Sequence, residues 1–88
     1  MKNITMVQAF TKFADENQGK IMHAYQINEG AAEIYGKTCT MSANDFAMPE
    51  TGKPTSKNNG TLFERVSENG KVVRGKYRIM KKDERPTI

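Results

Sequence analysis

Residues 60–82 constrain the fold of this chain more than any other stretch, because they have the pattern of a β-hairpin. Asn69-Gly70 lies near their middle, and this dipeptide favours a tight hairpin turn in which both positions take positive φ. The run that follows alternates between apolar and basic side chains, which are Tyr77, Ile79, Lys76 and Arg78. A strand with this alternation has one apolar face, and the rest of the chain must cover it.

Two segments before the hairpin have helical periodicity. In residues 5–17, apolar side chains recur at steps of three and four, and Thr5 is a suitable N-cap. A second helix lies within residues 21–36, with a start that could be as late as Asn28. Gly30 would weaken the middle of this helix by up to about 1 kcal/mol relative to alanine.

The segments between these helices and the hairpin are shorter and more polar. Ser42-Ala43-Asn44-Asp45 has the pattern of a capping box and predicts a third helix over residues 43–48, which Pro49 ends. Residues 50–60 are almost wholly polar and predict an irregular loop, with a single helical turn as the alternative. Residues 83–88 have no periodic pattern and predict a flexible tail.

This order of elements predicts an α+β fold, with three short helices followed by a C-terminal β-hairpin. The 88 residues are enough for one domain, which we place at residues 1–82. A domain of this size buries only about 60% of the surface of its unfolded chain, so its core is small. The hairpin must therefore fold back onto the helices to bury its apolar side chains, which are Leu62, Phe63, Tyr77 and Ile79.

The positive charge of the chain is concentrated in its C-terminal half. The formal net charge is +4, yet residues 1–40 balance four cations against four acids. Residues 51–82 carry nine cations against Glu64 and Glu68. Concentrated positive charge suits a polyanion such as nucleic acid. The alternative is a solvated basic face on an edge strand, where cations keep a small protein soluble and discourage aggregation.

Four short segments follow one another in a recognisable order. They are Ile34-Tyr35-Gly36, Ser42-Ala43-Asn44-Asp45-Phe46, Leu62-Phe63-Glu64-Arg65-Val66 and Gly75-Lys76-Tyr77-Arg78-Ile79. Together they resemble a small winged helix-turn-helix module of microbial restriction-associated and phage proteins, over residues 22–82. The resemblance implies a winged-helix-like fold with the hairpin as its wing, a nucleic-acid-binding role and no catalytic residues. The chain departs from that pattern at residues 50–60, which are too rich in Gly, Pro and Asn for a good recognition helix.

The candidate nucleic-acid-binding residues lie in the hairpin and in the polar loop. Arg74, Lys76 and Arg78 alternate along the second strand, so they share a face, and such a row of cations can follow a phosphate backbone. The loop offers lysine and asparagine side chains for phosphates and base edges. The candidates are Lys53, Ser56, Lys57, Asn58, Asn59, Lys71, Arg74, Lys76, Arg78 and Lys81.

The sequence offers little for catalysis, metal binding or membrane association. Cys39 is the only cysteine, which excludes a disulfide within the chain and a cysteine metal cluster. His23 is the only histidine, and Asp45 is interpreted as a capping carboxylate. Without a phosphate loop or nucleophile elbow, we expect no enzyme activity and no cofactor. With no signal peptide and no long apolar run, we expect a cytoplasmic protein without a membrane partner.

Two functional hypotheses follow. The first is a non-enzymatic regulator of phage or mobile-element type that contacts duplex DNA through the basic wing and the polar loop. The second is a small phage-type inhibitor or adaptor that binds a host enzyme or transcription component, which joint exposure of Met41, Met48 and Met80 would favour. RNA binding is disfavoured, because Phe63 and Tyr77 are expected in the core and leave no stacking platform. A homodimer is compatible with either hypothesis, although no heptad pattern is present.

Overall fold

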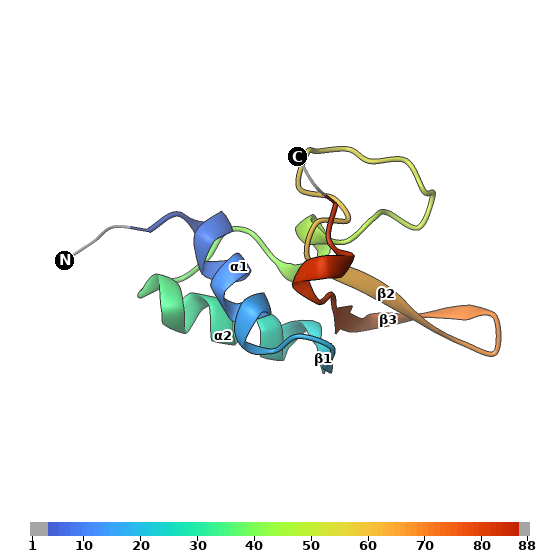
Figure 1. Cartoon of the computed structure of the whole chain (residues 1–88), viewed down its shortest axis with the longest axis horizontal. Helices are drawn as coiled ribbons and strands as arrows, with labels where there is room; N and C mark the ends of the chain where they lie inside the picture. The colour runs from blue at the N-terminus through green and yellow to red at the C-terminus, as the bar shows by residue number, and fades with distance from the viewer. Residues whose placement is uncertain (1–3, 87–88) are drawn as a thin grey trace.

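The structure is a computed structural model that describes residues 4–86. Its elements are α1 (Met6–Glu16), β1 (Ile21–His23), α2 (Ala24–Tyr35), the 3₁₀ helix η1 (Ala43–Phe46), β2 (Phe63–Glu68), β3 (Lys71–Ile79) and the 3₁₀ helix η2 (Lys82–Glu84). The strands form one antiparallel sheet in the order β1-β3-β2. Figure 1 shows α1 and α2 at one end and the β2–β3 hairpin projecting at the other. The predicted α+β class is confirmed.

The two α-helices begin and end at residues that favour such boundaries. Thr5 and Gln8 form a capping box at the start of α1, in which the Thr5 hydroxyl accepts from the Gln8 N–H at 3.0 Å and the Gln8 side chain accepts from the Thr5 N–H at 2.9 Å. Gly36 ends α2 with a φ of 89°, a left-handed conformation that glycine adopts without steric cost. The first helix is therefore confirmed with its predicted cap.

The core is built around three stacked or edge-on phenylalanine rings. The Phe10 and Phe46 rings stack with centroids 4.7 Å apart, and Phe63 meets both edge-on at 6.5 Å and 6.1 Å. These rings come from α1, η1 and β2, so one cluster joins the helices to the sheet. The hairpin does fold back as predicted, because all four of its expected apolar side chains are buried, namely Leu62, Phe63, Tyr77 and Ile79.

The hairpin turn is confirmed, but the place of its second strand in the sheet differs from the edge position considered above. Asn69 and Gly70 have φ values of 51° and 77°, as a tight two-residue turn requires. β3 is the central strand, because β1 pairs with it along the side that β2 leaves open. The sequence did not predict β1, since three residues are too few to establish an alternating pattern.

The predicted third helix is wrong in length and type. Only the four residues of η1 are helical, and they form 3₁₀ rather than α-helical turns. The Asp45 carboxylate accepts from the Ser42 N–H at 2.8 Å, as the capping pattern indicated, but the chain is extended again at Ala47. Two α-helices therefore replace the expected three. Residues 50–60 form turns and bends without a helix, which confirms the expected irregular loop.

The first residues of the predicted tail are held by specific contacts. Arg85 donates to the Asp15 carboxylate at 2.6 Å and to the Met80 carbonyl at 3.1 Å, and its side chain is only 12% exposed. The last two residues of the tail, 87–88, lie outside the described residues, as do residues 1–3. Across residues 4–86, neither helix has the length and apolarity that crossing a bilayer demands.

Candidate nucleic-acid interface

The predicted row of cations on β3 is interrupted. Tyr77 and Ile79 are buried, so Lys76 and Arg78 lie on the opposite, outer face of the sheet. The register of β2 and β3 shifts between Arg65 and Ser67, and Gly75 has a φ of 78°. Regular alternation is therefore broken between Arg74 and Lys76. This break removes the reason for placing the Arg74 side chain on the face that carries Lys76 and Arg78.

Arg78 is already occupied by two carboxylates. Its guanidinium pairs with Glu64, and a second nitrogen lies 3.1 Å and 3.2 Å from the two oxygens of Glu84. The bonds to Glu84, followed by those to Glu64, raise the pKa of Arg78 above its ordinary value. A phosphate would have to displace one of these acids, so Arg78 stabilises the outer face of the sheet rather than offering a free charge.

The other predicted cations of the hairpin are held loosely. Lys76 is 3.9 Å from Glu68, and Arg74 is 3.7 Å from Glu50 with 87% of its side chain exposed. Exposed ion pairs of this length contribute little to stability, so a polyanion can exchange for the carboxylate at small cost. Lys71 and Lys81 have no carboxylate within 4.0 Å among residues 4–86.

The polar loop contains one residue with a structural role and several that face solvent. The Asn59 side-chain oxygen Oδ1 accepts from the N–H groups of Thr55 and Ser56 at 2.6 Å and 3.0 Å, and its side-chain Nδ2 donates to the Asp45 backbone carbonyl at 3.0 Å. Asn59 thus holds the loop in shape and has little capacity left for a base edge. Lys53 and Lys57 are exposed, and neither forms an ion pair within the described part of the chain.

Ser56 and Asn58 take part in the turn that carries these lysines. The Ser56 hydroxyl accepts from the Asn58 N–H at 3.3 Å, and the Asn58 carbonyl accepts from the Thr61 hydroxyl at 2.6 Å. The Asn58 amide group forms no hydrogen bond within residues 4–86, so it keeps its donors and acceptor for a ligand.

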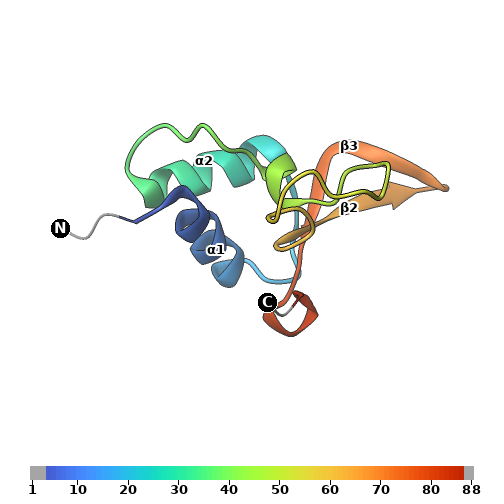
Figure 2. The same cartoon turned by 90° about the horizontal axis from the view of Figure 1, so that it is seen from above.

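Arg65 attaches η1 and the segment just before the loop to the hairpin, a role that sequence reasoning missed. Its Nε donates to the Met48 carbonyl at 2.6 Å, and its Nη2 donates to the Asn44 side chain at 2.9 Å. The guanidinium also lies 5.8 Å from the centre of the Tyr77 ring. Figure 2, seen from above, shows the loop of residues 50–60 lying over the hairpin. The contacts of Arg65 with Met48 and Asn44 span 17 and 21 positions in sequence, so no local sequence pattern predicts them.

A shallow hollow of about 400 Å³ separates the loop from the hairpin. The exposed side chains of Met48 and Val72 line it, and Glu50 and Arg65 add charge. Met80 also lines it but is buried, so the joint exposure of three methionines considered above does not occur.

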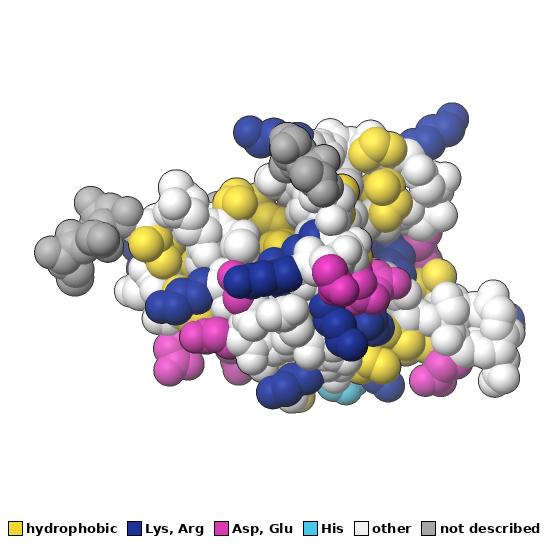
Figure 3. All heavy atoms as spheres, viewed as in Figure 1, with side chains coloured by type: hydrophobic (Ala, Val, Ile, Leu, Met, Phe, Trp, Pro, Cys, Tyr) yellow, Lys and Arg dark blue, Asp and Glu magenta, His cyan; other side chains and the backbone are white. Residues whose placement is uncertain are grey.

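Charge divides unequally between the two ends of the molecule. Residues 4–49 hold three cations and five acids, whereas residues 50–86 hold ten cations and five acids. The positive half is not a continuous basic surface, because its cations and acids are interleaved on the face shown in Figure 3. Within residues 50–86, the lysines without an ion pair lie in the loop, at the turn of the hairpin and just after β3, and they are Lys53, Lys57, Lys71 and Lys81.

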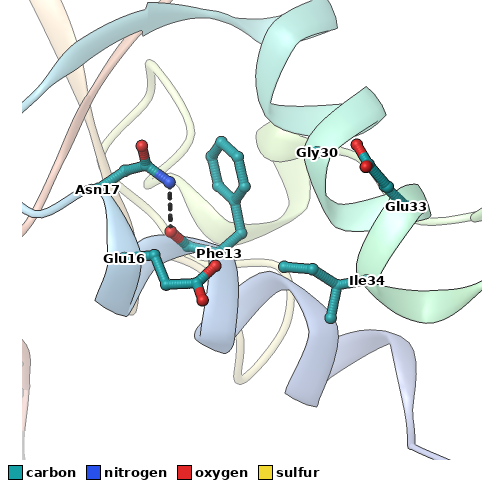
Figure 4. Close-up of a pocket in the computed structure, with 6 residues that line it drawn as sticks. All are labelled: Phe13, Glu16, Asn17, Gly30, Glu33 and Ile34. Atoms are coloured by element: carbon teal, nitrogen blue, oxygen red, sulfur yellow. Dashed lines mark hydrogen bonds between the residues drawn. The ribbon is translucent and has the colours of Figure 1, made fainter.

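A second hollow, between α1 and α2, has a different character. Figure 4 shows Phe13 and Ile34 lining it, with Glu16 and Glu33 beside them. Its lining residues include no cation and no nucleophile, and the Asn17 side-chain amide donates to the Phe13 carbonyl at 2.8 Å. Over residues 4–86, no three His, Cys, Asp or Glu side chains gather as metal ligands would.

Comparisons of the chain with models of known protein families, with curated proteins and with solved structures found no match. Its function therefore has to be inferred from the geometry of its own residues.

Proposed function

We propose that this protein is a non-enzymatic, winged-helix-like DNA-binding module that contacts duplex DNA with the tip of its hairpin and its polar loop. The observation that carries the proposal is the placement of free cations on these two neighbouring segments. Lys53, Lys57 and Lys71 are exposed without ion pairs in the described chain, and Arg74 has only a long contact to Glu50. A helix, strand, helix and hairpin in this order also support the winged-helix interpretation.

The contacts would be made mainly to phosphates. η1 is too short to enter a major groove, and its Phe46 and Ala43 are buried in the core. Of the two loop asparagines in the described chain, Asn58 keeps its side-chain amide free for a base edge, whereas the amide of Asn59 is engaged within the loop. Electrostatic attraction to the backbone therefore supplies most of the affinity, and sequence preference would be weak.

The proposal is tested by fluorescence anisotropy with a labelled duplex at several salt concentrations. The three lysines would give a slope of log affinity against log salt of about −2.7, at roughly −0.9 for each phosphate contact, and Arg74 would steepen it toward about −3.6 where it leaves Glu50. Lys53→Ala/Lys57→Ala should reduce the slope by about two contacts. Lys12→Ala/Lys37→Ala changes the net charge equally, in α1 and just after α2, and should leave the slope unchanged. Equal loss in both double variants would contradict the proposal.

A second candidate is the inhibitor or adaptor that binds a host protein. The exposed Met48 and Val72 beside the hollow between loop and hairpin favour it, because exposed apolar side chains around a hollow suit a protein partner. A stoichiometric partner retained from nuclease-treated lysate by the wild type, and lost with Val72→Asp, would support this function over DNA binding.

A further inference from the structure

An exposed pair of aromatic rings lies outside the interface proposed above. The His23 and Tyr25 rings are nearly parallel, with an interplanar angle of 15° and centroids 5.7 Å apart. Tyr25 is 61% exposed, and the nearby Ile21 is 54% exposed. The pair stands where β1 passes into α2, on the opposite side of the molecule from the loop of residues 50–60 (Figure 1).

Cations of the central strand stand beside this pair. Met22 packs against the core, so the alternation of β1 puts Ile21 and His23 on the outer face of the sheet. In the register of β1 and β3, Lys76 is directly opposite His23. Opposed residues of an antiparallel pair share a face, with Cβ atoms about 5 Å apart. An aromatic surface therefore lies next to an ammonium group.

We propose that His23 and Tyr25 form a stacking platform for an unpaired base of a single-stranded nucleic acid, and that Lys76 contacts the neighbouring phosphate. Every nucleobase has a flat π-face, so an exposed aromatic ring binds it without regard to sequence. Single-strand binding sites combine such rings with cations that follow the backbone. The contact of Lys76 with Glu68 is long, at 3.9 Å, and a phosphate can replace it.

The charges around the platform set the path of the strand. Glu29 lies one helical turn after Tyr25 on α2 and would repel a phosphate there. Across β3, Arg78 is held by Glu64 and Glu84, so Lys76 is left as the cation on this face for the phosphate. Sequence reasoning rejected a stacking platform because it considered only Phe63 and Tyr77, which are indeed buried. β1, which places Lys76 opposite His23, was not predicted from the sequence.

The test compares three side chains at position 25, using labelled oligo-dT and oligo-rU as probes. Tyr25→Leu keeps an apolar side chain and removes the ring, so the affinity for single strands should fall roughly tenfold or more. Tyr25→Phe keeps the ring and should bind within about twofold of the wild type. The chain has no tryptophan, so its tyrosines dominate its intrinsic fluorescence. Binding should quench this emission in the wild type and much less in Tyr25→Phe, although both proteins bind.

Each outcome decides the proposal. Binding of either oligonucleotide that is weakened by Tyr25→Leu and restored by Tyr25→Phe supports it, and the preferred probe shows whether DNA or RNA is the ligand. Equal affinity of Tyr25→Leu and the wild type would overturn it, as would absence of single-strand binding by the wild type. Duplex binding is measured in parallel with the single-strand assay, using the wild type and the Lys53→Ala/Lys57→Ala variant. Loss of the duplex function would leave the single-strand result unaffected, because the two variants alter separate sites.

Discussion

Asn59 shows how one side chain can carry the shape of a loop. Its amide group links residues 55–56 to the carbonyl of Asp45, so it joins the loop to η1. We expect Asn59→Ala to lower the free energy of unfolding by about 1–2 kcal/mol, because these partly buried partners lose their bonds. Urea denaturation measures the change. Asn58→Ala, whose side chain has no such bonds in residues 4–86, should change stability by less than about 0.5 kcal/mol.

Glu84 gives the C-terminal turn a dependence on pH. The Lys81 N–H and then the Arg78 guanidinium lower the pKa of Glu84 below its ordinary value. A carboxyl whose pKa is lower in the folded than in the unfolded state stabilises the fold above its unfolded pKa, about 4.3 for glutamate. That stability is lost as the pH falls through the lower, folded pKa.

We therefore expect the melting temperature of Glu84→Gln to lie below that of the wild type near neutral pH. The gap should narrow as the pH falls below about 4.3 and close once the pH is below the lower, folded pKa, because the wild-type carboxyl is then protonated in both states. Thermal melts followed by circular dichroism over this range measure it. Glu16→Gln is the control, because Glu16 is exposed and forms no ion pair within residues 4–86. A gap that persists unchanged in acid would show that the charge of Glu84 is not responsible.

Among the elements, the contact of α1 with α2 depends on a missing side chain. A Cβ atom at Gly30 would lie 2.2 Å and 2.6 Å from two ring carbons of Phe13, which is only 8% exposed. Alanine at an exposed helical site would gain up to about 1 kcal/mol over glycine, but here it must push the ring aside at a cost of about 1–3 kcal/mol. We expect Gly30→Ala to destabilise the protein by about 1 kcal/mol in urea denaturation. Stabilisation would mean that the ring moves freely into the neighbouring hollow.

The elements also differ in how far the sequence reveals them. The hairpin is predictable because its turn dipeptide and its alternation are both local, and the same holds for the capping box at Thr5. β1 is held by its pairing with residues 76–78, more than 50 positions away, and has no local signal of its own. The pairing of Arg78 and the anchoring role of Arg65 likewise depend on side chains brought together by the fold. Composition therefore identified the candidate cations, but it could not show which of them the fold leaves free of ion pairs.

At the scale of the whole molecule, the position of a charge should matter more than the net charge. Glu50→Gln and Glu33→Gln each raise the net charge by one, but only Glu50 lies beside a proposed phosphate contact, 3.7 Å from Arg74. Removing the Glu50 carboxylate frees Arg74 and should steepen the salt slope of duplex binding by up to about 0.9, the value for one phosphate contact. Glu33→Gln alters α2, at the helical end, and should leave the slope unchanged. Anisotropy titrations of both variants at matched salt measure the difference. Equal gains would mean that overall charge attracts the duplex without a defined interface, because a diffuse field does not distinguish the two ends of the molecule.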